Sequence, residues 1–174
     1  MKILVDADSC PARIRQIIIR AAVKQNIPAL FVAARPLPLP CGHKVRMIQV
    51  EAGDDAADRE ILRLLDNGDL IITRDIPLTA ELVERGNRVI NDRGVCYTQE
   101  NIRPLLSQRH STSKNALNTA LGTSIGTSSG TGARVAGIGS GERSFSSRDA
   151  HNFAAAFDRE LQASSKKQNR IEES

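Results

Sequence analysis

The sequence contains few aromatic residues and no long apolar segment. Aromatic residues make up 3% of the 174 residues, with one tyrosine and no tryptophan. Binding of single-stranded nucleic acid by base stacking needs several exposed rings, so this composition argues against a stacking platform. The longest apolar run, residues 27–34, is interrupted by Pro28, whereas a membrane-spanning helix needs about 20 apolar residues. The first apolar stretch, residues 3–5, ends in acidic residues, unlike a signal peptide.

Cysteine and net charge are also limited. Three scattered cysteines (Cys10, Cys41 and Cys96) do not form the pattern of a disulfide framework, and we expect a cytoplasmic protein. Residues 1–106 contain 15 basic and 14 acidic residues, so most of the net charge of +4 comes from the remainder of the chain. The excess is weak evidence for nucleic-acid affinity, and a solvated basic tail explains it more simply.

The first 106 residues alternate between short β-branched runs and segments with helical periodicity. After Pro11, for example, apolar residues recur at positions 14, 17, 18 and 21, which predicts an amphipathic helix. The expected strands are residues 2–6, 29–33, 45–50, 69–73 and 88–91, and the last expected helix of this part is 98–108. This alternation predicts an α/β fold with a parallel sheet of about five strands flanked by helices.

The composition changes after this part. Serine, threonine and glycine account for 21 of the 38 residues from 111 to 148, which predicts a flexible linker without a core of its own. We therefore divide the chain into an α/β domain (1–108), a disordered linker (109–146), a C-terminal helix that docks on the domain (147–163) and a polar tail (164–174). The apolar stripe of Phe153, Ala156, Phe157 and Leu161 supports that docking.

Acidic residues mark the carboxyl ends of two expected strands. Asp6 ends the first strand and Asp8 follows it, while Asp75 follows the fourth strand. Ligands of open parallel α/β sheets bind at this edge. Asp55 and Asp58 are three residues apart near the start of a helix that begins at the same edge, so they share one helix face.

These acids have local explanations as well as a functional one. Asp55 and Asp75 suit helix N-caps, and Asp8 suits the positive end of a helix dipole. As a set, however, five carboxylates at one edge repel one another and raise each other's pKa values. A divalent cation relieves that repulsion, and oxygen ligands favour Mg²⁺ or Mn²⁺. Such a cation activates water and stabilises charge on a phosphodiester.

Other candidate residues lie beside these acids. Cys10 stands at a helix N-terminus, where a thiol can become a nucleophile, but the sequence offers no histidine base near it and a packing role is the simpler interpretation. Arg93 lies in a turn-forming segment, and Arg74 precedes Asp75. Both arginines are candidates for phosphate binding if they face the acidic edge, and surface side chains otherwise.

Four segments resemble the YaiI/YqxD family of uncharacterised bacterial proteins. They are Val-Asp-Ala-Asp-Ser-Cys-Pro at 5–11, Gly-Asp-Asp-Ala-Ala-Asp at 53–58, Ile-Thr-Arg-Asp-Ile-Pro-Leu at 72–78, and Asn-Asp-Arg-Gly at 91–94 with Tyr-Thr at 97–98. The resemblance implies a PIN-like fold, which belongs to a nuclease superfamily with acidic residues around Mg²⁺ or Mn²⁺. By position, the family's acids correspond to Asp6, Asp8, Asp55, Asp58 and Asp75. Thr73 and Asn91 match polar positions beside them.

Three functions remain open from the sequence. The first is a metal-dependent nuclease, acting on RNA, in which Asp6, Asp75 and one or both of Asp55 and Asp58 hold the cation. Asp8 would orient or deprotonate water there. The second is a non-catalytic PIN-like module that binds nucleic acid or protein. The third is a phosphatase of the haloacid-dehalogenase type with Asp6 as nucleophile, although its acidic pair would precede Thr73 and the expected lysine is missing.

Overall fold

The computed structural model describes residues 1–40, 42–53, 55–107 and 145–172, with side chains described as far as residue 163. The expected linker therefore lies almost entirely outside the described residues. The strands are β1 (Ile3–Asp6), β2 (Ala29–Ala33), β3 (Val45–Gln49), β4 (Leu70–Ile72), β5 (Arg88–Ile90) and β6 (Cys96–Tyr97). The helices are α1 (Ala12–Lys24), α2 (Ala56–Leu64), α3 (Ile76–Glu84) and α5 (Ser147–Glu172), and residues 99–107 are also helical.

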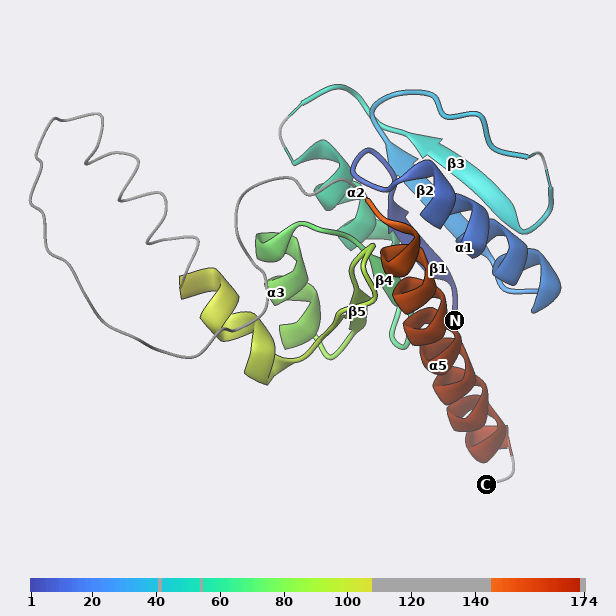
Figure 1. The fold of residues 1–174 in the computed structure, drawn as a ribbon, viewed down its shortest axis with the longest axis vertical. Coiled ribbons are helices and arrows are strands. Elements are labelled where there is room, and N and C mark those ends of the chain that lie inside the picture. Colours follow the sequence, from blue (N-terminus) through green and yellow to red (C-terminus); the bar gives the residue numbers. More distant parts are fainter. Residues whose placement is uncertain (41, 54, 108–144, 173–174) are drawn as a thin grey trace, which may run out of the picture.

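The six strands form one sheet in the order β3-β2-β1-β4-β5-β6. All neighbours are parallel except β5 and β6, which are antiparallel. This confirms the α/β class and the parallel sheet (Figure 1). The prediction of about five strands omitted β6, because its two residues carry no periodic signal of their own.

Both faces of the sheet are covered by helices, which explains why its central strands are apolar on both sides. Alternate residues of β1 point to opposite faces. Ile3 and Val5 pack with α1 and α5, whereas Leu4 packs with α2 and α3. The helices of each pair cover the same side of the sheet (Figure 1). Among the helices of the described residues, none has the length and hydropathy required to span a membrane.

The C-terminal helix α5 docks through its predicted apolar stripe. Phe153, Phe157 and Leu161 are fully buried, and the two phenylalanine rings stack with centroids 5.3 Å apart. The helix continues to Glu172, past residue 163, where the sequence prediction began a polar tail. The apolar stripe ends at Leu161, but the residues that follow include alanine, lysine, glutamine and glutamate, which are good helix formers. The end of the stripe is therefore not the end of the helix.

The sheet order places a topological switch point between β1 and β4. From β1 the chain moves outward through β2 and β3, and it then returns to form β4 on the other side of β1. At such a point the connections after the two strands diverge and leave a crevice at their carboxyl ends. Asp6 is the last residue of β1, and Thr73 follows the last residue of β4.

Candidate functional site

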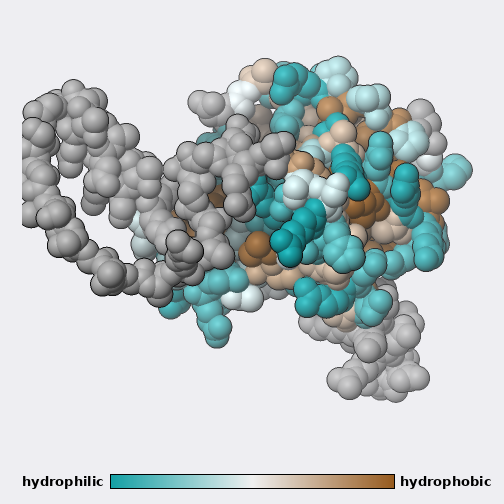
Figure 2. All heavy atoms as spheres, viewed as in Figure 1, coloured by the Kyte–Doolittle hydropathy of each residue, from teal (hydrophilic) through white to brown (hydrophobic). Residues whose placement is uncertain are grey.

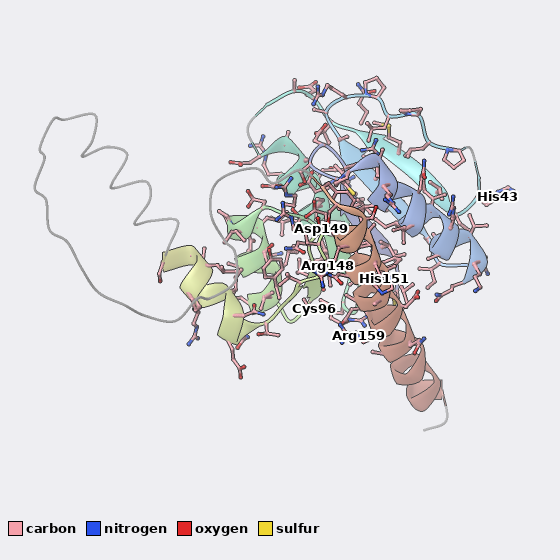
Figure 3. The ribbon with its side chains drawn as sticks, viewed as in Figure 1. His43, Cys96, Arg148, Asp149, His151 and Arg159 are labelled. Carbon is pink, nitrogen blue, oxygen red and sulfur yellow. The ribbon has the colours of Figure 1, made fainter. Side chains whose placement is uncertain are left out.

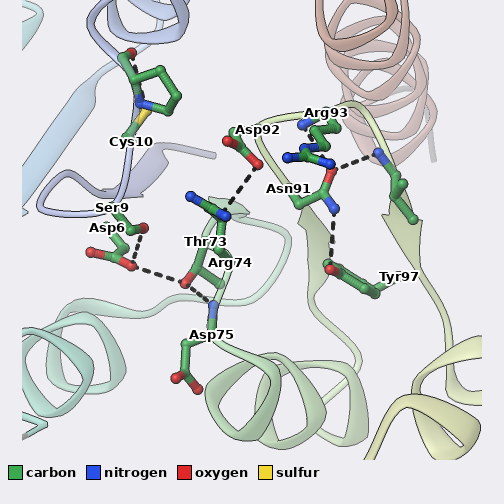
Figure 4. A network of polar contacts seen from close by, with 12 residues as sticks. Asp6, Ser9, Cys10, Thr73, Arg74, Asp75, Asn91, Asp92, Arg93 and Tyr97 are labelled. Atoms are coloured by element: carbon green, nitrogen blue, oxygen red, sulfur yellow. Dashed lines mark hydrogen bonds and ion pairs between the residues drawn. The ribbon is translucent and has the colours of Figure 1, made fainter. Parts of the chain in front are cut away.

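Asp6 and Thr73 meet at the switch point. The Thr73 hydroxyl donates a hydrogen bond to Asp6 Oδ2 at 3.2 Å, and the Ser9 hydroxyl donates to the same oxygen at 2.8 Å (Figure 4). Asp6 is only 8% exposed. Burial raises the pKa of the Asp6 carboxyl, the hydroxyl donors oppose that change, and the negative charge of Asp8 adds to it. The buried carboxylate is therefore held by neutral donors.

Asp75 is connected to Asp6 through Thr73. Thr73 Oγ1 accepts a hydrogen bond from the backbone N–H of Asp75 at 3.0 Å. Asp75 is also the N-cap of α3, because its Oδ1 accepts from the Leu78 N–H at 2.8 Å. The local capping role and the position at the carboxyl edge, which the sequence left as alternatives, thus coexist in one residue. Thr73 fixes the relative position of the two acids.

Asp58 lies in the first turn of α2 and faces the same group of acids. Burial, followed by the charges of Asp75, Asp6 and Asp55, raises the pKa of the Asp58 carboxyl to about 6. Acids from three separate segments of the chain therefore act on one carboxyl group. The structure brings Asp6, Asp55 and Asp75 within electrostatic range of Asp58.

Asp55 occupies the N-cap position of α2 in an unusual way. Its backbone is left-handed, with φ +59°, and its side chain makes no capping hydrogen bond. Left-handed backbone is tolerated by aspartate better than by most residues. The capping role predicted for Asp55 is therefore wrong. Its charge, instead, is one of those that act on Asp58.

Asp8 is bonded to the residue that follows β2. Its Oδ2 accepts a hydrogen bond from the backbone N–H of Ala34 at 2.7 Å, and the residue is exposed. Asp8 still affects Asp6 electrostatically. Among the five predicted acids, Asp8 is the one that is hydrogen-bonded to the segment after β2.

The β5–β6 turn contributes a sixth acid, Asp92, which the sequence analysis treated only as part of a turn. Asp92 is 4% exposed, and Arg74 Nε lies 3.7 Å from its Oδ1. Burial raises the pKa of Asp92, while the charges of Arg74 and Arg93 lower it. Both predicted phosphate-binding arginines therefore lie close to Asp92 (Figure 4). Asp92 follows the end of β5 much as Asp75 follows β4. This position after a strand is the feature of the sequence from which Asp92 could have been predicted as a site residue.

Asn91 organises the same turn. Its side-chain oxygen accepts from the backbone N–H groups of Arg93 and Val95, each at 2.9 Å, and its amide donates to the Tyr97 hydroxyl at 3.2 Å. These contacts use both ends of the amide to close the turn and join it to β6. Asn91 thus supports the turn that carries Arg93, and these hydrogen bonds go to that turn and to β6.

Cys10 is a packing residue. It is 5% exposed, and burial raises the pKa of its thiol to about 12. The charge of Arg15 lowers this pKa, whereas the charges of Asp92 and Asp6 raise it. A thiol with so high a pKa is protonated at neutral pH and is a poor nucleophile. This agrees with the simpler of the two interpretations from sequence.

The donor chemistry of the site fits a hard divalent cation, because the charged groups that act on Asp58 are carboxylates. The distances between these carboxylates are too long for a metal site. Within the described side chains, no three acidic, histidine or cysteine residues lie close enough together to hold a metal ion. Binding a cation would therefore require rotation of at least one carboxylate.

Comparison with known proteins defines the class of protein: the chain belongs to a bacterial family of α/β proteins whose function is uncharacterised. Residues 4–163 match the family model described as "Uncharacterized BCR, YaiI/YqxD family". The chain is thus a member of the YaiI/YqxD family, which confirms the resemblance drawn from its motifs.

Several relatives match over nearly their whole length. The "UPF0178 protein DP1304" of Desulfotalea psychrophila is 40% identical over 92% of this chain and 97% of its own. The "UPF0178 protein" of Marinobacter nauticus is 39% identical over 96% of this chain and 100% of its own. No solved structure matches the chain.

Proposed function

We propose that the protein is a metal-dependent nuclease of the PIN-like type that hydrolyses phosphodiester bonds in RNA. The observation that carries the proposal is the group of acids around Asp58, drawn from β1, α2 and the start of α3. Bringing like charges together costs free energy, and structures retain such groups where function requires them. The switch point of the sheet is also where ligands bind in folds of this kind.

Asp6, Asp58 and Asp75 are the residues that would hold Mg²⁺ or Mn²⁺, with Asp55 beside them. The cation would lower the pKa of a bound water and neutralise charge on the phosphodiester. Thr73 positions Asp6 relative to Asp75 through the two hydrogen bonds described above. In this proposal Asp8, which is exposed and acts electrostatically on Asp6, would accept a proton from water, and Arg74 and Arg93 would supply positive charge to the substrate phosphate.

The arrangement of lysines argues against the phosphatase alternative. Lys2 precedes β1, Lys24 ends α1 and Lys44 precedes β3, so the lysines with described side chains lie at the amino edge of the sheet. A phosphatase with Asp6 as a covalent nucleophile needs a lysine near the aspartyl phosphate. The described part of the chain supplies arginines there instead.

Calorimetric titration with Mn²⁺ tests the proposal directly. We expect the wild-type protein to bind Mn²⁺, and the Asp58→Asn and Asp6→Asn variants to lose at least about tenfold in affinity, as removal of one charged ligand predicts. Glu84→Gln is the matched control, because Glu84 is exposed at the far end of α3. Wild-type protein should also cleave a labelled RNA in Mn²⁺, and Asp6→Asn should not.

The outcomes separate the two remaining functions. Binding of RNA without Mn²⁺ binding or cleavage would overturn the nuclease proposal and favour the non-catalytic module. Equal Mn²⁺ affinity in wild type and Asp58→Asn would remove Asp58 from the site.

A further inference from the structure

A groove lined by basic side chains runs between α1 and α5, on the side of the sheet away from α2 and α3. It has a volume of about 540 Å³ and is lined by Arg13, Gln16, Ile17, Arg20, Ser147, Ala150 and His151. Figure 3 labels His151 on α5, and this residue lines the groove together with the α1 residues. Hydrophilic side chains dominate the face of the molecule shown in Figure 2. The two helices therefore form a groove that is lined mainly by polar side chains and that takes no part in the proposed nuclease mechanism.

The two arginines of the groove, Arg13 and Arg20, form no ion pair among the described residues. Both are exposed, and the arginine ion pairs that the structure describes involve other positions. The described residues that line the groove include no aspartate or glutamate. The guanidinium of Arg13 donates to the Ser147 hydroxyl at 3.0 Å, which holds it beside the first residue of α5.

The spacing of the arginines suits a chain of anions. Arg13 and Arg20 are seven residues apart on one helix, which is two turns, or roughly 10 Å along its axis. That separation suits two phosphates of one polymer better than a single phosphate. Arginine is also the side chain that best matches phosphate geometry.

The groove begins at the same edge of the sheet as the acids. Arg13 lies in the first turn of α1, shortly after Asp6, and Ser147 is the first residue of α5. The second turn of α5 packs against the β5–β6 turn, since a Cβ on Gly94 would lie 2.5 Å from the Asn152 carbonyl oxygen. The charge of Asp149, in the first turn of α5, also acts on Asp92. A polymer in the groove would thus lead directly to the acidic edge.

We infer that the α1–α5 groove, with Arg13 and Arg20 as its anion-binding side chains, binds the phosphodiester backbone of single-stranded RNA and directs it toward the acidic edge. The choice of RNA rests on the proposed nuclease function. Recognition is mainly by charge, because the described lining includes two arginines and no phenylalanine, tyrosine or tryptophan. Binding is therefore independent of RNA sequence and strongly dependent on salt.

Fluorescence anisotropy of a labelled oligouridylate, measured in EDTA so that no cation or cleavage contributes, tests the inference. Arg20→Glu should weaken binding at least about tenfold and lower the slope of log K against log salt by about 0.7, the value for one phosphate contact to a single strand. Arg85→Glu makes the same charge change at the end of α3 and should leave binding unchanged. Arg20→Glu keeps the Arg13–Ser147 contact, so docking of α5 is preserved.

Three results would overturn the inference: no RNA binding by wild type, equal affinity of wild type and Arg20→Glu, or equal weakening by Arg85→Glu. A polyglutamate peptide that displaces RNA as effectively as unlabelled RNA would assign the groove to acidic peptides instead.

The experiment also distinguishes this inference from the proposed nuclease function. Asp6→Asn should retain RNA binding in EDTA, and Arg20→Glu should retain Mn²⁺ binding. If wild type neither binds Mn²⁺ nor cleaves RNA, while Arg20→Glu weakens RNA binding, the groove stands and the nuclease proposal fails.

Discussion

The two edges of the sheet each bury an aspartate, and they treat its charge in opposite ways. At the amino edge, Asp69 is 1% exposed and lies 2.6 Å from the Lys2 ammonium, and it also accepts backbone hydrogen bonds from Lys2 and Asp66. At the carboxyl edge, Asp6 is held by the hydroxyls of Ser9 and Thr73. The first carboxylate is neutralised by a cation of the protein, and the second lies among other acids.

The pKa values of neighbouring groups follow this difference. Burial by itself lowers the pKa of Lys2, but hydrogen bonds and charges from Asp66 and Asp69 raise it above the ordinary value. The same contacts lower the pKa of Asp66. At the other edge, burial and like charges raise the pKa values of Asp6 and Asp58. The amino edge pairs its buried carboxylate with a lysine, whereas Asp6 and Asp58 at the carboxyl edge lie among like charges, an arrangement that is common at functional sites.

The largest expected effect compares the same substitution at the two edges. Asp69→Asn should cost about 4 kcal/mol in the free energy of unfolding, because it breaks a buried ion pair and turns an amide donor toward N–H donors. Asp6→Asn should leave stability unchanged or raise it, since it removes a buried charge from among like charges. Urea denaturation of both variants at pH 7 measures the difference. A comparable loss in both variants would contradict the contrast between the edges.

A second comparison uses two glycines with similar backbone conformation. Gly94, beside the acidic edge, has φ +82°, and a Cβ there would lie 2.5 Å from the Asn152 carbonyl oxygen. Gly86, at the end of α3, has φ +79°, and a Cβ there would meet nothing within 4 Å. Gly86→Ala should cost about 1 kcal/mol for the left-handed backbone alone. Gly94→Ala should cost about 3 kcal/mol, because backbone of α5 must also move.

Thermal unfolding of the two glycine variants checks that difference. Equal losses of stability in the two variants would mean that the backbone of α5 near Asn152 moves at little cost in free energy. A larger loss in Gly94→Ala, accompanied by weaker RNA binding, would show that the docking of α5 maintains the groove.

The sequence predicted most of the fold because the central strands are apolar on both faces and the helices carry clear stripes. It missed β6, a two-residue strand whose pairing with β5 depends on the turn that Asn91 closes. The sequence correctly predicted that Asp6 and Asp75 lie at the same edge of the sheet, because the carboxyl ends of parallel strands share one edge. It did not distinguish Asp8, which bonds to Ala34, from Asp58, which faces the other acids.

Those site details depend on side-chain direction, which sequence spacing does not determine. Asp92 is an example. The sequence shows that it belongs to a turn, but its burial beside Arg74 depends on how the β5–β6 turn packs. The α1–α5 groove is another, since its two walls are more than a hundred residues apart in the chain.

A smaller effect concerns the pH dependence of stability at the acidic edge. The pKa of Asp58 is about 6 in the folded protein and about 3.9 in an unfolded chain. Between pH 4 and 6, roughly, the folded state holds more protons than the unfolded state, so stability falls as pH rises through this window. Above this window the ionised Asp58 carboxylate destabilises the folded state. Because Asp58 is half-buried, solvent screening reduces this loss of stability to about 1 kcal/mol.

Asp58→Asn removes this penalty. The variant should therefore be about 1 kcal/mol more stable than wild type at pH 8 and equally stable at pH 4. Melting temperatures across the range give the measurement, with Glu84→Gln as the control for loss of one exposed charge. A constant difference between Asp58→Asn and wild type at every pH would show that the acids do not interact in the folded state.

The smallest expected effect is at the Arg74–Asp92 pair, which is the ion pair of the carboxyl edge among the described residues. Its atoms are 3.7 Å apart, and Arg74 remains 40% exposed, so Arg74→Ala should lower stability by about 0.5 kcal/mol. The pKa of Asp92 should rise further, because burial already raises it and Arg74 opposes that shift. Carboxyl carbon NMR measures the pKa, and urea denaturation measures the stability. Arg63→Ala, which breaks an exposed pair with Glu60 on α2, should show a similarly small loss of stability without the change at Asp92. If Arg74→Ala costs as much as Asp69→Asn, the carboxyl edge is as fully compensated as the amino edge, and the distinction between them fails.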